Sequence, residues 1–138
     1  MHIGSEHEYI NIIEIDRNAA GSPCAGNIKA EITLKLHSFQ GSYDEVWLEH
    51  SEIMRFLSEV KNLESSHRGS AKIASVSPDE LLFEVRSFDN LGHMEIEVQL
   101  HCYQFDGTKY RPTFLKGEFE INPSNLHKII SIFEAFTI

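Results

Sequence analysis

Hydrophobic and polar residues alternate with a period of two over most of the chain, which is the pattern of β-strands with one buried face. The clearest stretch is 94–102, with apolar residues Met94 to Cys102 at every second position. Its opposite face carries His93, Glu95, Glu97, Gln99 and His101. Similar patterns predict further strands at 9–15, 28–36, 43–50, 71–75, 81–86 and 113–121. A turn is expected at 39–42, and another at Asp106-Gly107.

The apolar spacing changes to that of an α-helix in two segments, near 51–63 and 123–136. Ser51 is the expected N-cap of the first, and Asn122 with Pro123 the expected start of the second. Short connections between the later strands require antiparallel pairing. The sequence therefore predicts an α+β fold with two layers, in which two amphipathic helices cover one face of a mainly antiparallel sheet.

The chain has 138 residues, which fits a single domain over 1–138. It has no apolar run near the ~20 residues that span a bilayer, and its start lacks the features of a signal peptide. Cys24 lies in a predicted loop, and Cys102 falls on the apolar side of a strand, where a buried thiol is expected. These features predict a cytoplasmic protein without a disulfide framework.

The formal net charge is −9, from 12 basic and 21 acidic residues. Nucleic-acid-binding proteins carry the opposite excess because they contact phosphates, and anionic membranes also attract basic segments. We therefore expect neither nucleic acid nor a membrane as the partner. An acidic surface suits a basic protein partner, although the same charge could serve solubility alone.

Two alternative sites involve the polar row of the strand at 94–102. His93, Glu95, Glu97 and His101 are residue types that bind zinc, but alternate residues of one strand lie roughly 6.5–7 Å apart and cannot surround one ion. Glu118 and Glu120 could join Glu95 and Glu97 as paired carboxylates for acid–base chemistry, which requires a pocket that shifts a pKa. A solvated sheet face explains the same pattern. The sequence predicts no catalytic residue, metal or cofactor.

Trp47 shares its predicted strand face with Tyr43, Glu45 and Glu49. A tryptophan among acids on a solvated face is typical of a binding hot spot, whereas a tryptophan packed under a loop would be structural. The binding interpretation predicts a partner surface made of acidic residues and one aromatic residue: Glu45, Trp47, Glu49, Glu95, Glu97, Glu118 and Glu120.

The stretch from Trp47 to the C-terminus resembles the WapI family of bacterial immunity proteins. The matching features are Glu52-Ile53-x-x-Phe56-Leu57-x-x-Val60, Gly69-Ser70-Ala71, Leu82-Phe83-Glu84-Val85, Gly92, and Phe119-Glu120-Ile121-Asn122-Pro123-x-x-Leu126. The resemblance implies a small cytoplasmic antitoxin that binds the C-terminal domain of a polymorphic toxin, and it implies no catalytic residues.

Three functions remain open at this point. The first is an immunity protein that neutralises a basic toxin domain. The second is a metal- or carboxylate-dependent enzyme on the polar sheet face. The third is a regulatory or structural domain whose acidity confers only solubility.

Overall fold

The computed structural model describes residues 2–77 and 79–138, which form strands and two helices around one hydrophobic core. Antiparallel strands form two four-stranded sheets, and a short hairpin adds two more strands. Sheet A has the order β1-β2-β3-β4, with bounds Ile3–Gly4, Glu8–Arg17, Ile28–Leu36 and Phe39–Leu48. Sheet B has the order β10-β7-β6-β5, with bounds Thr113–Ile121, Met94–Cys102, Leu81–Ser87 and Ser70–Ala74. The hairpin consists of β8 (Phe105–Asp106) and β9 (Lys109–Tyr110).

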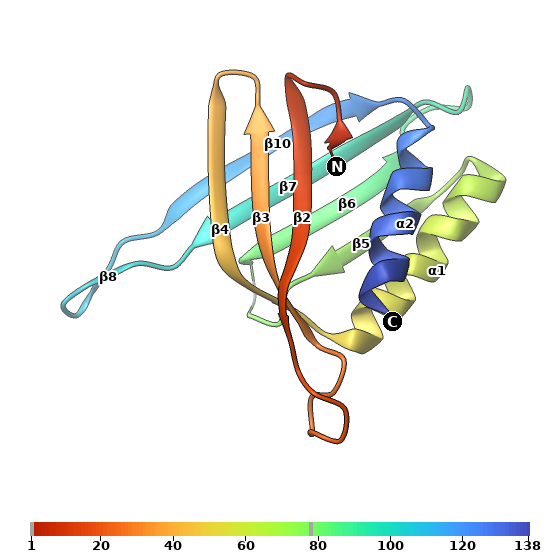
Figure 1. Cartoon of the computed structure of the whole chain (residues 1–138). Helices are drawn as coiled ribbons and strands as arrows, with labels where there is room; N and C mark the ends of the chain where they lie inside the picture. Colours follow the sequence, from red (N-terminus) through yellow and green to blue (C-terminus); the bar gives the residue numbers. More distant parts are fainter. Residues whose placement is uncertain (1, 78) are drawn as a thin grey trace.

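Helix α1 (His50–Ser66) connects the two sheets, and α2 (Asn125–Phe136) follows β10. Figure 1 shows β2, β3 and β4 crossing in front of sheet B, with both helices beside them on the same side of that sheet. One layer is therefore sheet B, and the other combines sheet A with the helices. The α+β class, the antiparallel pairing and the helices on one sheet face are confirmed. The finding that the alternation did not predict is the division of the strands into two sheets.

The core lies between these layers. Phe56 of α1 packs against Phe83 of β6 and Phe133 of α2, with ring centroids 5.7 and 4.7 Å apart. The sheets approach closely at β10, where a Cβ on Gly117 would lie 2.7 Å from Cδ1 of Leu36. A side chain at position 117 would therefore push the layers apart. Among the described residues, no helix is long and apolar enough to cross a membrane.

Several predicted boundaries differ from the structure. The turn before β4 lies at residues 37–38, where His37 has a φ of 55°, so the prediction of a turn at 39–42 was wrong. Helix α1 begins at His50, and its first N–H donates to Oδ1 of Asn27 at 2.9 Å. Ser51 is therefore not the N-cap: Glu49 holds that position, and the acceptor for the first amide comes from the β2–β3 loop. Helix α2 begins two residues later than predicted, because Asn122 and Pro123 form a turn that precedes it.

Candidate partner-binding surface

The outer face of sheet B, opposite the core, carries most of the acidic residues that the sequence singled out. Glu97 lies between Glu84 on β6 and Glu118 on β10, and Glu95 lies between Arg86 and Glu120. Like charges directly opposite one another on a sheet are destabilising, so this arrangement needs compensation. We call this surface the acidic face: Glu84, Arg86, Glu95, Glu97, Lys116, Glu118 and Glu120.

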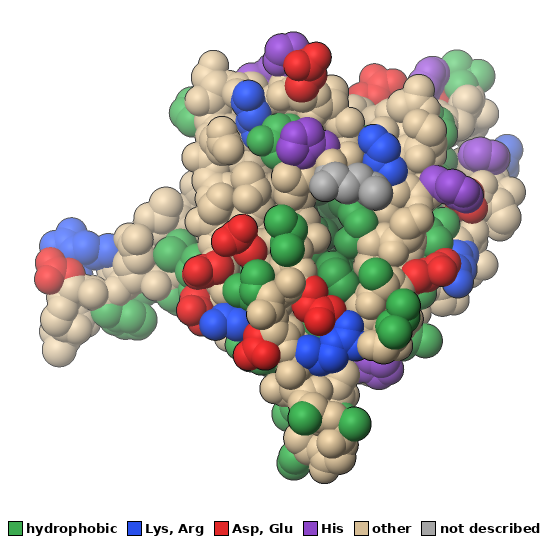
Figure 2. Space-filling model, in the orientation of Figure 1, with side chains coloured by type: hydrophobic (Ala, Val, Ile, Leu, Met, Phe, Trp, Pro, Cys, Tyr) green, Lys and Arg blue, Asp and Glu red, His purple; other side chains and the backbone are tan. Residues whose placement is uncertain are grey.

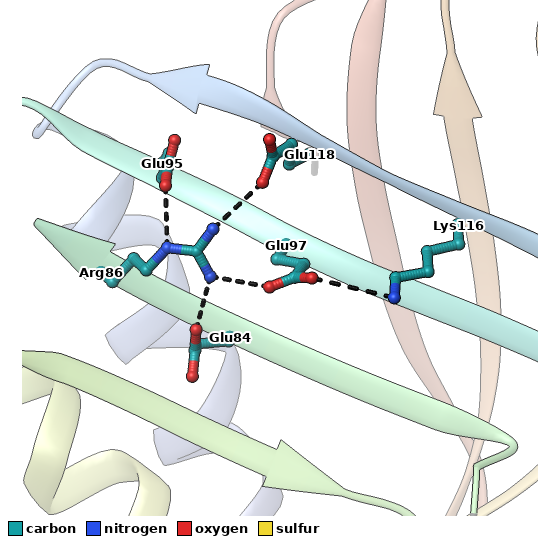
Figure 3. A network of polar contacts seen from close by, with 6 residues as sticks. All are labelled: Glu84, Arg86, Glu95, Glu97, Lys116 and Glu118. Carbon is teal, nitrogen blue, oxygen red and sulfur yellow. Dashed lines mark hydrogen bonds and ion pairs between the residues drawn. The ribbon is translucent and has the colours of Figure 1, made fainter. Parts of the chain in front are cut away.

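Arg86 supplies the compensation from the centre of the acidic face (Figure 3). Its guanidinium donates to Glu84 at 2.5 Å, to Glu95 and Glu97 at 2.8 Å, and to Glu118 at 3.1 Å. Lys116 lies 4.0 Å from Glu97. The hydrogen bond from Arg86 is the main cause that lowers the pKa of Glu97, and the carboxylates in turn raise the pKa of Arg86. Arg86 thus stabilises the charged form of Glu97, and carboxylates outnumber cations on the acidic face.

The two histidines at the ends of the polar row have separate environments. Nδ1 of His93 lies 2.5 Å from Asp89, and this contact raises the pKa of His93. His101 is instead 3% exposed and lies among aromatic rings. The expectation that His101 is on a solvated surface was wrong, because rings from the end of sheet B cover it. No group of three or more potential ligands in the described part of the chain is placed to hold a metal ion.

The rings around His101 form an aromatic cluster that the sequence analysis did not predict: Tyr103, Phe105, Tyr110 and Phe114, with His101 at the centre. Phe114 stacks on His101 with centroids 4.0 Å apart, and Tyr110 Oη lies 2.6 Å from His101 Nε2. Cys102, expected to be buried, is half-exposed. The hydrophobic core ends before this part of β7. His101 on the outer side of the strand is therefore buried by the rings, while Cys102 on the inner side is partly exposed. Four aromatic residues flanking the Asp106-Gly107 turn were the available signal in the sequence.

The remaining predicted residues lie on sheet A, whose outer face points away from sheet B. A bulge between Ala30 and Ile32 places two residues of β4 opposite one of β3. Trp47 remains half-buried on the outer side, where Glu45 contacts Lys29 at 3.2 Å. Glu49 is the exposed N-cap residue of α1. The predicted surface is therefore split: Glu95, Glu97, Glu118 and Glu120 lie on sheet B, and Glu45, Trp47 and Glu49 lie with sheet A.

The same bulge turns Tyr43 toward the core, so the prediction that it shares a face with Trp47 was wrong. Tyr43 Oη donates to Glu80 Oε2 at 3.1 Å. Burial, together with this contact to a carboxylate, raises the pKa of Tyr43 to about 12. Tyr43 therefore stays a neutral hydrogen-bond donor toward Glu80 and packs partly buried against the core.

Comparison with known proteins gives one result. No curated protein and no solved structure matches the chain. A family model, the immunity protein WapI-like family, matches residues 3–137. This match includes sheet A, whereas the resemblance seen in the sequence began only at Trp47. The chain belongs to the WapI-like immunity protein family.

Proposed function

We propose that this protein binds a cognate toxin domain in the cytoplasm and neutralises it by occupying its surface, with no catalytic step of its own. Family membership supports a protein partner and a protective role. The observation that carries the rest of the proposal is the acidic face, where carboxylates outnumber basic side chains across three neighbouring strands. Such a surface complements a basic protein and increases the rate of encounter with it.

The acidic face is a better candidate than the outer face of sheet A. Arg86 fixes the carboxylates of Glu84, Glu95, Glu97 and Glu118 in place, so little side-chain entropy is lost when a partner binds them. Of the carboxylates that the sequence predicted for the partner surface, four lie on the acidic face and two, Glu45 and Glu49, lie with sheet A, where Glu45 contacts Lys29. Because the two faces point in opposite directions, one rigid partner surface would engage one of them.

The test uses two charge reversals that change the net charge equally. The double variant Glu118→Lys/Glu120→Lys alters the acidic face at exposed positions, and Glu45→Lys/Glu49→Lys is the matched control on sheet A. The toxin domain encoded by the neighbouring gene is the probe, in a cell-protection assay and in binding kinetics. We expect the first variant to slow association and reduce protection, and the control to leave both near wild type.

Three results would contradict parts of the proposal. If the wild-type protein neither binds nor protects against the neighbouring toxin domain, the proposed function is wrong. If only the control variant loses binding, sheet A is the interface. If the association rate of the wild-type protein does not fall as salt rises, charge does not guide the encounter.

A further inference from the structure

The aromatic cluster lies on the same side of sheet B as the acidic face. Along β7, His101 continues the row of Glu95, Glu97 and Gln99, and along β10, Phe114 continues the row of Glu118 and Lys116. The cross-strand pair Phe114–His101 therefore follows directly after the charged pairs. The outer face of sheet B changes from carboxylates at one end to aromatic rings at the other.

The rings of this cluster are held in place but exposed. One face of Phe114 covers His101, and the Phe114 side chain is still 55% exposed, so its other face is open to solvent. Phe105 is 67% exposed and packs on Tyr110, whose hydroxyl contacts His101. In Figure 1 this end of sheet B projects from the body with β8, and Figure 2 shows hydrophobic side chains on the projection. Exposed aromatic side chains in fixed positions are typical of binding hot spots.

A shallow hollow adjoins the cluster at the edge of β10. Its lining includes the exposed rings of Phe39 and Phe114 and the carboxylates of Glu8 and Glu118. The basic side chains at its rim already face carboxylates, since His37 lies 3.1 Å from Glu8 and Lys116 lies 4.0 Å from Glu97. Aromatic faces beside carboxylates are a suitable environment for a cationic side chain.

We propose that the aromatic cluster is the main source of affinity for the toxin partner and that Phe114 receives an arginine side chain from a basic partner surface. The proposal rests on the proposed function and assigns two roles to one face. The carboxylates increase the encounter rate, and the rings slow dissociation. Phe114 and Tyr110 thereby take the role that the sequence analysis gave to Trp47.

Arginine fits this position for two reasons. Its planar guanidinium stacks on an aromatic ring while its N–H groups donate to carboxylates at the ring's edge. The lining of the hollow has both elements on one side of β10: Phe114, and Glu118 four residues further along, with Lys116 between them. A partner approaching the acidic face with several basic residues would therefore place one of them over the ring.

The experiment measures the dissociation constant and dissociation rate of the neighbouring toxin domain for a set of ring variants. Phe114→Ala should raise the dissociation constant about 30-fold, the change typical of a hot spot, mainly through faster dissociation. Phe114→Leu keeps apolar surface but removes the π face, and should recover only part of this loss. Ile13→Ala, an exposed apolar residue on sheet A, is the matched control and should change binding less than twofold. Circular dichroism and thermal unfolding of each variant establish that it is folded.

A second probe tests the cluster independently of the toxin. A short oligoarginine peptide is titrated into the wild-type protein and followed by NMR of the aromatic side chains, with oligoglutamate as control. We expect the peptide to shift the resonances of Phe114 and Tyr110 in the wild-type protein. In Phe114→Leu we expect the shift at Tyr110 to become smaller. Oligoglutamate should leave them unchanged.

The outcomes separate the two proposals. If the toxin binds but folded Phe114→Ala binds it as tightly as wild type, the aromatic proposal is wrong and the proposed function stands. If Trp47→Ala weakens binding and Phe114→Ala does not, affinity resides on sheet A. If the toxin does not bind at all, the proposed function fails, and the peptide titration decides alone. The aromatic proposal is then overturned if the oligoarginine peptide leaves the resonances of the cluster unshifted.

Discussion

Phe83 and Glu84 are neighbours in β6, yet they belong to two surfaces that are held by different forces. Phe83 is fully buried against Phe56 on the inner side of sheet B. Glu84 lies on the outer side, where hydrogen bonds to Arg86 stabilise a group of like charges. The inner side contributes stability by removing apolar surface from water, and the outer side presents charged groups to solvent. Substitutions on the two sides should therefore differ in size and in their dependence on pH and salt.

The largest effect is expected on the inner side. Phe83→Ala would leave a cavity beside Phe56 and should lower the free energy of unfolding by about 3–5 kcal/mol. Urea unfolding followed by circular dichroism measures this loss. Phe105→Ala, which truncates a ring that is 67% exposed, is the control and should cost much less. Equal losses in the two variants would mean that Phe83 does not belong to the core.

A smaller effect is expected when Arg86 is replaced. Arg86→Met keeps the length of the side chain but leaves the four carboxylates that Arg86 contacts without a common donor. We expect a loss of about 1–2 kcal/mol at neutral pH, at the low end for charged hydrogen bonds because the site is partly exposed. The loss should shrink at acidic pH, where the carboxylates become neutral. Lys109→Met on the β8–β9 hairpin is the control, and a loss independent of pH would argue against the network.

The pH dependence of stability tests the same network without removing Arg86. The pKa of Glu97 is lowered in the folded protein, mainly by its hydrogen bond from Arg86. The stabilisation is therefore present above the unfolded-state pKa of about 4.3 and is lost as the pH falls through the lower folded pKa. Glu97→Gln should flatten this part of the stability curve, measured by urea unfolding between pH 7 and pH 3. A curve as steep as that of wild type would exclude Glu97 as a contributor.

The smallest effect is expected at the exposed pair of His93 and Asp89. The hydrogen bond that His93 donates to Asp89 raises the pKa of His93, so its stabilisation is complete below the ordinary histidine pKa and is lost as the pH rises through the raised value. NMR titration of the imidazole should show this pKa falling in Asp89→Asn. Stability at neutral pH should hardly change, because exposed ion pairs contribute little. An unchanged histidine pKa would mean that the pair does not form in solution.

Alternation along the chain predicted several strands residue for residue, because burial of one face depends on local sequence. β3, β7 and β10 have the predicted bounds, and the apolar residues of β7 from Met94 to Leu100 are buried as expected. The features that were missed depend on partners distant in sequence. The bulge opposite Glu31 turns Tyr43 inward, and the burial of His101 requires Phe114 from the next strand. Periodicity also does not show which strands pair, so it could not separate two sheets from one.

The predicted site was incomplete for a related reason. Charges at alternate positions identified Glu95, Glu97, Glu118 and Glu120 on one surface, where the structure places them. The cation at their centre, Arg86, falls within the strand predicted at 81–86, but the sequence did not connect it with these carboxylates. Its contacts with β7 and β10 follow from the order of strands in sheet B, which the sequence does not specify.

The contact between Asn27 and the first amide of α1 has a consequence for how the protein unfolds. Asn27 closes the loop between two strands of sheet A, while His50 opens the helix that leads to sheet B. If that loop opens, the helix loses an N-terminal hydrogen bond and its first turn frays. The amides of the loop and of the first helical turn should then exchange with solvent together, as one cooperative unit that joins the N-terminal sheet to the rest of the chain.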